Sequence, residues 1–108
     1  MKKRKRLKNE KALEAARGLP CAACNAPPPS DPSHIKSVGA GGPDTEWNLM
    51  PMCRWCHSAW HELGWYSALT FEPRIRRALL AKGWQVITDV FLKPKLWHPN
   101  LAEPGKVE

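Results

Sequence analysis

The sequence contains no long apolar run. None of its 108 residues belongs to a segment approaching the roughly 20 apolar residues that a membrane-spanning helix needs. The basic N-terminus also lacks the apolar stretch of a signal peptide, because residues 8–11 are polar and the run at 12–16 is too short. We therefore expect an intracellular, cytoplasmic protein without a membrane partner.

Nothing in the sequence points to an oxidising compartment, and this bears on its four cysteines. Disulfides persist mainly in secreted proteins, whereas paired cysteines in a reducing compartment more often bind metal. The chain also has 11 prolines, and residues 18–52 are mostly small, polar or proline, so they can bury little core. Chains this small often need a metal or covalent cross-link, and we favour metal.

The cysteines form two matched pairs, Cys21-x-x-Cys24 and Cys53-x-x-Cys56, separated by 28 residues. The two-residue spacing lets both sulfurs of a pair converge on one ion, and four thiolates suit a closed, tetrahedral Zn2+ site. Such a site has no open position for water, so we expect it to be structural. In an alternative partition, the second pair would join histidines as in a zinc finger. We rank this lower, because it leaves the first pair without a role.

The stretch from Cys21 to His61 also holds Asn48 and three of the four histidines, which a structural zinc site does not need. His57 and His61 are four residues apart, so on a helix they share one face and can bind one metal. His34 and Asn48 fall in two predicted strands that a hairpin would bring together. An imidazole can act as a general base near neutral pH, and an asparagine can hold its ring in orientation.

The local patterns predict a small α+β fold. Helices are expected at residues 2–17, 53–63 and 72–82, with glycines at their ends. Short strands or extended segments are expected at residues 34–38, 47–52 and 84–92, with a flexible loop at 39–44.

Composition shifts suggest where the chain divides. We expect a basic arm or helix at residues 1–17 and a core domain at residues 18–92. Prolines predict an irregular tail at residues 93–108.

In these motifs the chain resembles the HNH family of ββα-metal endonucleases. The match runs from Cys21 to about Gly64, through CAAC, SHIKSVGAGG and WNLMPMCRWCHSAWHELG in that order. The resemblance implies a ββα-metal core, in which a long-loop β-hairpin and a helix are joined by a structural zinc knuckle and flanked by further helices. It also implies that His34 activates water, that Asn48 is the middle residue of the motif, and that His57 and His61 bind a catalytic metal.

One position departs from the family pattern. The residue before the general base is usually Asp or His and binds the metal, whereas here it is Ser33, whose neutral hydroxyl is a poor ligand. We expect the metal to be held by His57, His61, waters and the substrate phosphate. Asp31 is the alternative protein ligand, if the Asp31-Pro32 turn folds back.

The net charge of +7 is concentrated near the N-terminus. Residues 2–11 carry seven Lys or Arg against Glu10 alone. Such an arm predicts contact with a polyphosphate backbone, and the alternative is an ordinary solvated tail. The residues expected to contact nucleic acid are Lys2, Lys3, Arg4, Lys5, Arg6 and Arg54.

Together these features predict a metal-dependent endonuclease, a hydrolase that cleaves DNA phosphodiester bonds. Its cofactors would be a structural Zn2+ and a catalytic divalent ion such as Mg2+ or Mn2+. The alternative is a non-catalytic zinc-binding module that contacts DNA or a partner protein, for which six tryptophans could supply surface. We expect Trp55, Trp60 and Trp65 instead to pack the 53–63 helix against its neighbours. The sequence defines no oligomeric state.

Overall fold

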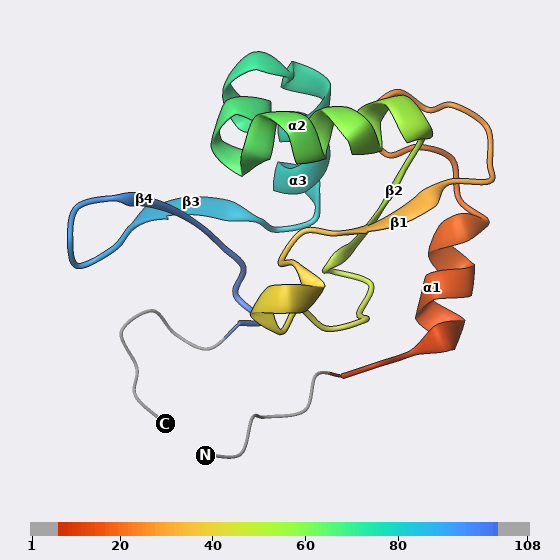
Figure 1. Ribbon diagram of the computed structural model, residues 1–108, viewed down its shortest axis with the longest axis horizontal. Coiled ribbons are helices and arrows are strands. Elements are labelled where there is room, and N and C mark those ends of the chain that lie inside the picture. The colour runs from red at the N-terminus through yellow and green to blue at the C-terminus, as the bar shows by residue number, and fades with distance from the viewer. Residues whose placement is uncertain (1–6, 102–108) are drawn as a thin grey trace.

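The computed structural model describes residues 7–101, so the basic residues Lys2, Lys3, Arg4, Lys5 and Arg6 lie outside the described part. In chain order the elements are α1 (Glu10–Arg17), β1 (Asp31–His34), the short 3-10 helix η1 (Val38–Ala40), β2 (Leu49–Met52), α2 (Arg54–Phe71), α3 (Pro73–Ala81), β3 (Gln85–Thr88) and β4 (Pro94–Trp97). The hairpin β1–β2 crosses the middle of the molecule, with α2 above it and α1 beside it, while β3 and β4 project on the far side (Figure 1). No helix between residues 7 and 101 is long and apolar enough to cross a membrane.

Strands β1 and β2 pair antiparallel, with Asp31 opposite Met52 and His34 opposite Leu49. The first strand expected at residues 34–38 is wrong, because β1 ends where that strand should begin. The physical reason is the Asn48 side chain, which accepts a hydrogen bond from the backbone N–H of Lys36 and donates one to its carbonyl. These bonds occupy the backbone groups that would otherwise extend the sheet. The second strand is confirmed, and every residue of β2 is buried.

Helix α2 begins as predicted, since Cys53 is its N-cap and accepts a hydrogen bond from the Cys56 N–H. Gly64 interrupts the helix with φ of 77°, a conformation that favours glycine. The predicted stop is therefore a kink, and a further helical segment up to Phe71 follows it. Helix α3 is confirmed, with Pro73 in its first turn, where a missing N–H is tolerated.

The core forms between the hairpin, α2 and α3. Met50, Trp60, Leu79 and Trp84 are among its buried side chains. Trp65 is half-buried against this core, but Trp55 is 67% exposed, so the expectation that it packs the helix is wrong. Neighbouring positions on α2 supply the inward face instead.

Residues 94–97 are not irregular, which corrects the expected tail. They form β4, which pairs antiparallel with β3. The Asp89 side chain closes the connecting turn by accepting hydrogen bonds from the N–H groups of Phe91 and Lys93. Beyond β4, the buried His98 stacks on Trp47 with ring centroids 4.6 Å apart. These contacts attach the end of the ribbon to the core.

Candidate functional site

The four cysteines lie together as predicted. Their sulfurs are all within 4.8 Å of one another, and Cys24 Sγ lies 3.6 Å from Cys53 Sγ. A tetrahedral Zn2+ with Zn–S bonds of about 2.3 Å places its sulfurs about 3.8 Å apart. All four cysteines are free rather than disulfide-bonded. The cluster therefore fits a closed four-thiolate metal site, which connects the Cys21 loop to the start of α2.

The electrostatics of this cluster also favour a bound cation. Burial alone would raise the pKa of Cys21, but backbone hydrogen bonds from Cys24, Cys53 and Ala23 lower it to about 6. Burial and the neighbouring sulfurs raise the pKa of Cys56 well above its ordinary value. Without a cation, a thiolate at Cys21 thus disfavours a second thiolate at Cys56. A divalent ion would remove that conflict.

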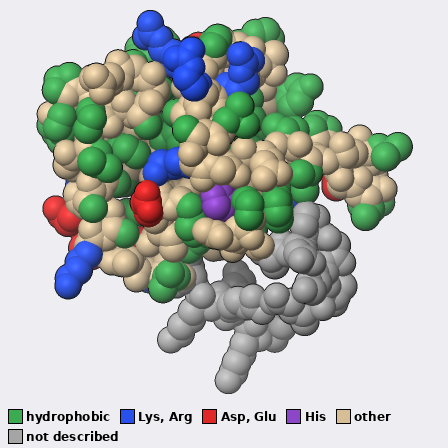
Figure 2. Space-filling model, turned by 180° about the vertical axis from the view of Figure 1, so that it is seen from behind, with side chains coloured by type: hydrophobic (Ala, Val, Ile, Leu, Met, Phe, Trp, Pro, Cys, Tyr) green, Lys and Arg blue, Asp and Glu red, His purple; other side chains and the backbone are tan. Residues whose placement is uncertain are grey.

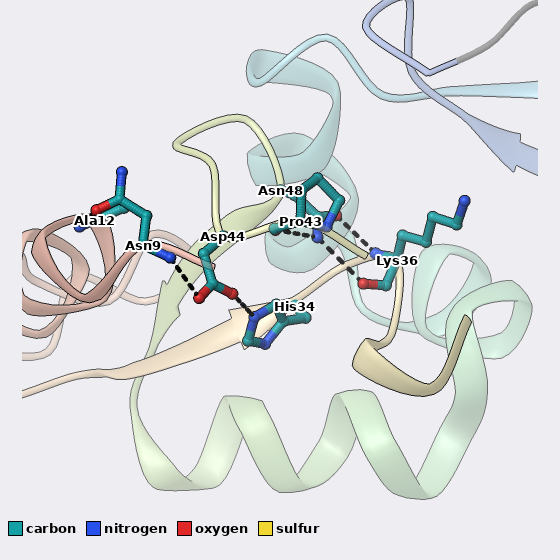
Figure 3. A network of polar contacts seen from close by, with 7 residues as sticks. All are labelled: Asn9, Ala12, His34, Lys36, Pro43, Asp44 and Asn48. Carbon is teal, nitrogen blue, oxygen red and sulfur yellow. Dashed lines mark hydrogen bonds and ion pairs between the residues drawn. The ribbon is translucent and has the colours of Figure 1, made fainter. Parts of the chain in front are cut away.

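His34 forms a close pair with a residue that the sequence did not single out. Its Nε2 lies 2.8 Å from Oδ1 of Asp44, and both side chains are shown in Figure 3. An ionised carboxylate can only accept a hydrogen bond, so we assign the ring proton to Nε2 and the lone pair to Nδ1. Nδ1 makes no hydrogen bond within residues 7–101, and the His34 side chain is 19% exposed. This nitrogen can therefore accept a proton.

Asp44 is itself held by the start of α1. Its Oδ2 accepts the backbone N–H of Asn9 at 2.9 Å (Figure 3). The N–H of Asp44 donates to the carbonyl of Leu7 at 2.8 Å. Its side chain is only 3% exposed. The sequence indicated this role of Asp44 only weakly. The loop between the two strands holds two carboxylates, Asp44 and Glu46, and no spacing distinguishes one from the other.

Asn48 does not orient the His34 ring as expected. It is fully buried, and its Oδ1 accepts from the Lys36 N–H at 2.8 Å. Its Nδ2 donates to the carbonyls of Lys36 and Pro43, at 3.1 and 2.9 Å (Figure 3). Both amide hydrogens are used on the backbone, so none is left for the imidazole. Asn48 closes the loop that carries Asp44, and Asp44 orients the ring.

His57 and His61 converge on the surface of α2 as predicted. Their Nε2 atoms are 2.9 Å apart, and Nδ1 of His57 lies 3.0 Å from Oδ2 of Asp31. Two nitrogens bound at right angles to one ion, with bonds of about 2.1 Å, would be about 3.0 Å apart. The spacing of the two Nε2 atoms therefore suits one divalent ion bound by both imidazoles.

Asp31 lies behind His57 rather than in the ligand set. Its hydrogen bond with His57, followed by the contact with Arg54, lowers the pKa of this carboxyl. A charged carboxylate on the far nitrogen of a ligating histidine fixes its tautomer and makes it a stronger ligand. Arg54, expected to contact nucleic acid, places its Nε 3.1 Å from Asp31 while 85% of its side chain remains exposed.

Ser33, at the position where the family pattern has a ligand, is buried. It is 1% exposed, and its Oγ finds no hydrogen-bond partner among the described residues. Within the described part of the chain, His57 and His61 are thus the two imidazoles that converge on a shared point. The remaining ligand positions are open to water or substrate.

The comparisons with known proteins agree with this geometry. The family model "HNH endonuclease" matches residues 21–63, which include both cysteine pairs, the β1–β2 hairpin and the histidine pair on α2. No curated protein and no solved structure matches the chain. The segment 21–63 belongs to the HNH endonuclease family, and its ββα unit carries a four-cysteine metal site.

Proposed function

We propose that this chain is a metal-dependent endonuclease that hydrolyses DNA phosphodiester bonds and leaves 5′-phosphate and 3′-hydroxyl ends. The observation that carries the proposal is the pair of Nε2 atoms on His57 and His61, 2.9 Å apart within the HNH segment. The exposed His61 and the half-buried His57, which is backed by a carboxylate, form an open metal site, in contrast to the closed cysteine cluster.

His34 acts as the general base in this proposal. Its Nδ1 takes a proton from the water that attacks the phosphorus, and the oxygen of that water forms the new bond as the bond from phosphorus to the 3′ oxygen breaks. The departing 3′ oxygen takes a proton from solvent water to give the hydroxyl end. Asp44 keeps the proton on Nε2 before the reaction and stabilises the imidazolium that forms. The contact of Asp44 with Asn9 holds the carboxylate in place during this change.

His57 and His61 would hold the catalytic divalent ion, such as Mg2+ or Mn2+. When bound, the ion supplies positive charge that stabilises the phosphate and the departing oxygen. Asp31 orients His57 for this task, and it also anchors the exposed Arg54 nearby. A guanidinium in this position can contact the DNA backbone without reading its sequence.

The cysteine cluster holds a structural Zn2+ in the proposed function. Cys53 is the N-cap of α2 and Cys56 lies in its first turn, directly before His57. The ion would thus fix the start of α2 relative to the chain before β1. The basic arm at residues 2–11 would bind the DNA backbone, and the carbonyl of Leu7 within it accepts a hydrogen bond from the N–H of Asp44, which lies beside His34.

A plasmid nicking assay tests the proposal. The purified protein is freed of loosely bound metal, and supercoiled DNA is then incubated with it in the absence or presence of added Mg2+ or Mn2+. We expect nicking only after metal is restored, with ends that DNA ligase can reseal. Salt-dependent DNA binding without cleavage under any divalent ion would instead favour the non-catalytic zinc module, for which the burial of Ser33 is the supporting observation.

A further inference from the structure

A groove lies beside the cysteine cluster, between the start of α2 and the first turns of α3. Its volume is about 530 Å³, and Ala23, Pro73 and Ile75 contribute apolar lining. Trp55, Arg74 and Arg77 also line it. Figure 2 shows Lys and Arg side chains gathered at the end of the molecule where α2 and α3 lie. The groove thus combines an apolar interior with cationic side chains.

Trp55 is unusual among the tryptophans. It is 67% exposed, whereas Trp60 and Trp84 are only 6% and 2% exposed in the core. Within the described residues its indole stacks on no other aromatic ring, in contrast to Trp47 and Trp84. The groove therefore offers a flat aromatic surface to a partner.

The two groove arginines are also unusual. Of the arginines in residues 7–101, Arg17 pairs with Glu10 and Glu14, Arg54 with Asp31, and Arg76 donates to the carbonyl of Leu69. The side chains of Arg74 and Arg77 form no hydrogen bond or ion pair within the same residues. They are three apart on α3 and so are neighbours on its surface. Glu72 is the one carboxylate in the lining, and the wall opposite α3 is formed in part by Cys24, Cys53 and Cys56 of the cysteine cluster.

We propose that this groove binds an unpaired strand of nucleic acid. One base stacks on Trp55, and the adjacent phosphates contact Arg74 and Arg77. A flat apolar surface beside two free guanidinium groups matches the combination of ring and anion in a nucleotide. A duplex presents no free base face, so the stacking contact selects single strands.

The position of the groove suits a strand that also reaches the histidine pair. Trp55 and His57 are separated by about 160° around the axis of α2 on the side that carries Arg54. The exposed Arg54 lies between them on the solvent side of the helix. A single strand crossing this side could contact both sites. The proposed binding does not require cleavage, so it can be tested independently of the nuclease function.

Fluorescence anisotropy tests the proposal, with a labelled oligothymidine of about 12 nucleotides and a duplex of equal length. A His34→Ala background without added divalent ion prevents cleavage. We expect Trp55→Ala to weaken single-strand binding about tenfold or more and duplex binding less than about twofold. Trp55→Phe should retain most of the affinity. Phe71→Ala removes another exposed aromatic side chain of α2 outside the groove and serves as the matched control.

Salt dependence gives a second readout. Each of Arg74→Ala and Arg77→Ala should reduce the slope of log K against log salt for the single strand by about 0.7. Zinc content and the melting curve verify that each variant is folded. Unchanged single-strand binding by Trp55→Ala, or an equal loss for single strand and duplex, would overturn the proposal. Nicking by the wild type in the same preparation would then leave the proposed function intact.

Discussion

Asp44 Oδ1 lies 2.8 Å from His34 Nε2, and this contact determines which ring nitrogen is free to accept a proton. The carboxylate does not come from the neighbouring strand. It comes from the loop between β1 and β2, which Asn48 closes from within. The other carboxylate oxygen is bound by the start of α1. The orientation of the proposed base therefore depends on two segments outside the hairpin strands.

Replacing Asp44 by Asn should separate catalysis from binding. The amide is nearly isosteric but carries no charge, and it can rotate to donate to the ring and favour the wrong tautomer. We expect the nicking rate of Asp44→Asn to fall by about 100-fold or more, while its dissociation constant for duplex DNA stays within about twofold of wild type.

Single-turnover nicking and anisotropy measure these two quantities. Asp89→Asn, in the distant β3–β4 turn, is the matched control. A nicking rate for Asp44→Asn equal to that of wild type would show that Asp44 does not position the base.

Asp31, whose carboxylate is hydrogen-bonded to Nδ1 of His57, gives a second prediction. Asp31→Asn keeps the shape of the side chain but removes the charge behind His57, so the affinity for Mn2+ should fall by about 10- to 100-fold. Titration calorimetry with Mn2+ measures this affinity, and bound zinc should stay the same because Asp31 is not part of the cysteine cluster. Mn2+ affinity that does not change would mean that Asp31 does not support the metal site.

Two glycines of the loop form a matched pair for a stability test. A Cβ on Gly42 would lie 1.8 Å from the carbonyl oxygen of Lys36, whereas one on Gly39 would meet no atom within 4 Å. We expect Gly42→Ala to lower the free energy of unfolding by about 3 kcal/mol, because the loop must open to admit the methyl group.

Gly39→Ala should be neutral or slightly stabilising, by less than about 1 kcal/mol. Urea unfolding followed by circular dichroism compares the two. Equal stabilities for the two variants would contradict the close loop packing around Lys36.

The cysteine cluster predicts a tightly bound metal that is distinct from the catalytic ion. Brief chelation should remove added Mn2+ but leave about one zinc per chain, because a closed four-thiolate site exchanges slowly. Cys56→Ser should abolish this zinc and unfold the domain, as measured by metal analysis and circular dichroism. A chain that holds no zinc after brief chelation, yet remains folded, would contradict the structural role.

The features that could be predicted from the sequence are those whose partners are set by short spacings. The two-residue spacing of each cysteine pair and the four-residue spacing of His57 and His61 depend only on local geometry. Pro73 likewise marked a helix start correctly, whereas Gly64, predicted to end its helix, marks a kink within α2.

The features that were missed depend on contacts between distant segments. Strand β1 was missed because it contains Pro32, and proline is disfavoured in strands except at the edges of a sheet. Proline is tolerated here because both strands of a two-stranded sheet are edge strands. Asp44 acquires its partners from residues 7–9 and from His34, and neither pairing follows from a sequence pattern. The last strand, β4, was missed because Pro94 indicated an irregular segment. The stacking of His98 on Trp47 attaches the end of this strand to the core.

The most direct test of the central claim is the nicking rate of His34→Ala beside that of wild type, with zinc retained and Mn2+ saturating. His34 is partly exposed and bonded through one nitrogen, so its loss should leave the fold and the metal sites in place. We expect a rate at least about 100-fold below that of wild type. Equal rates for the two proteins would contradict it.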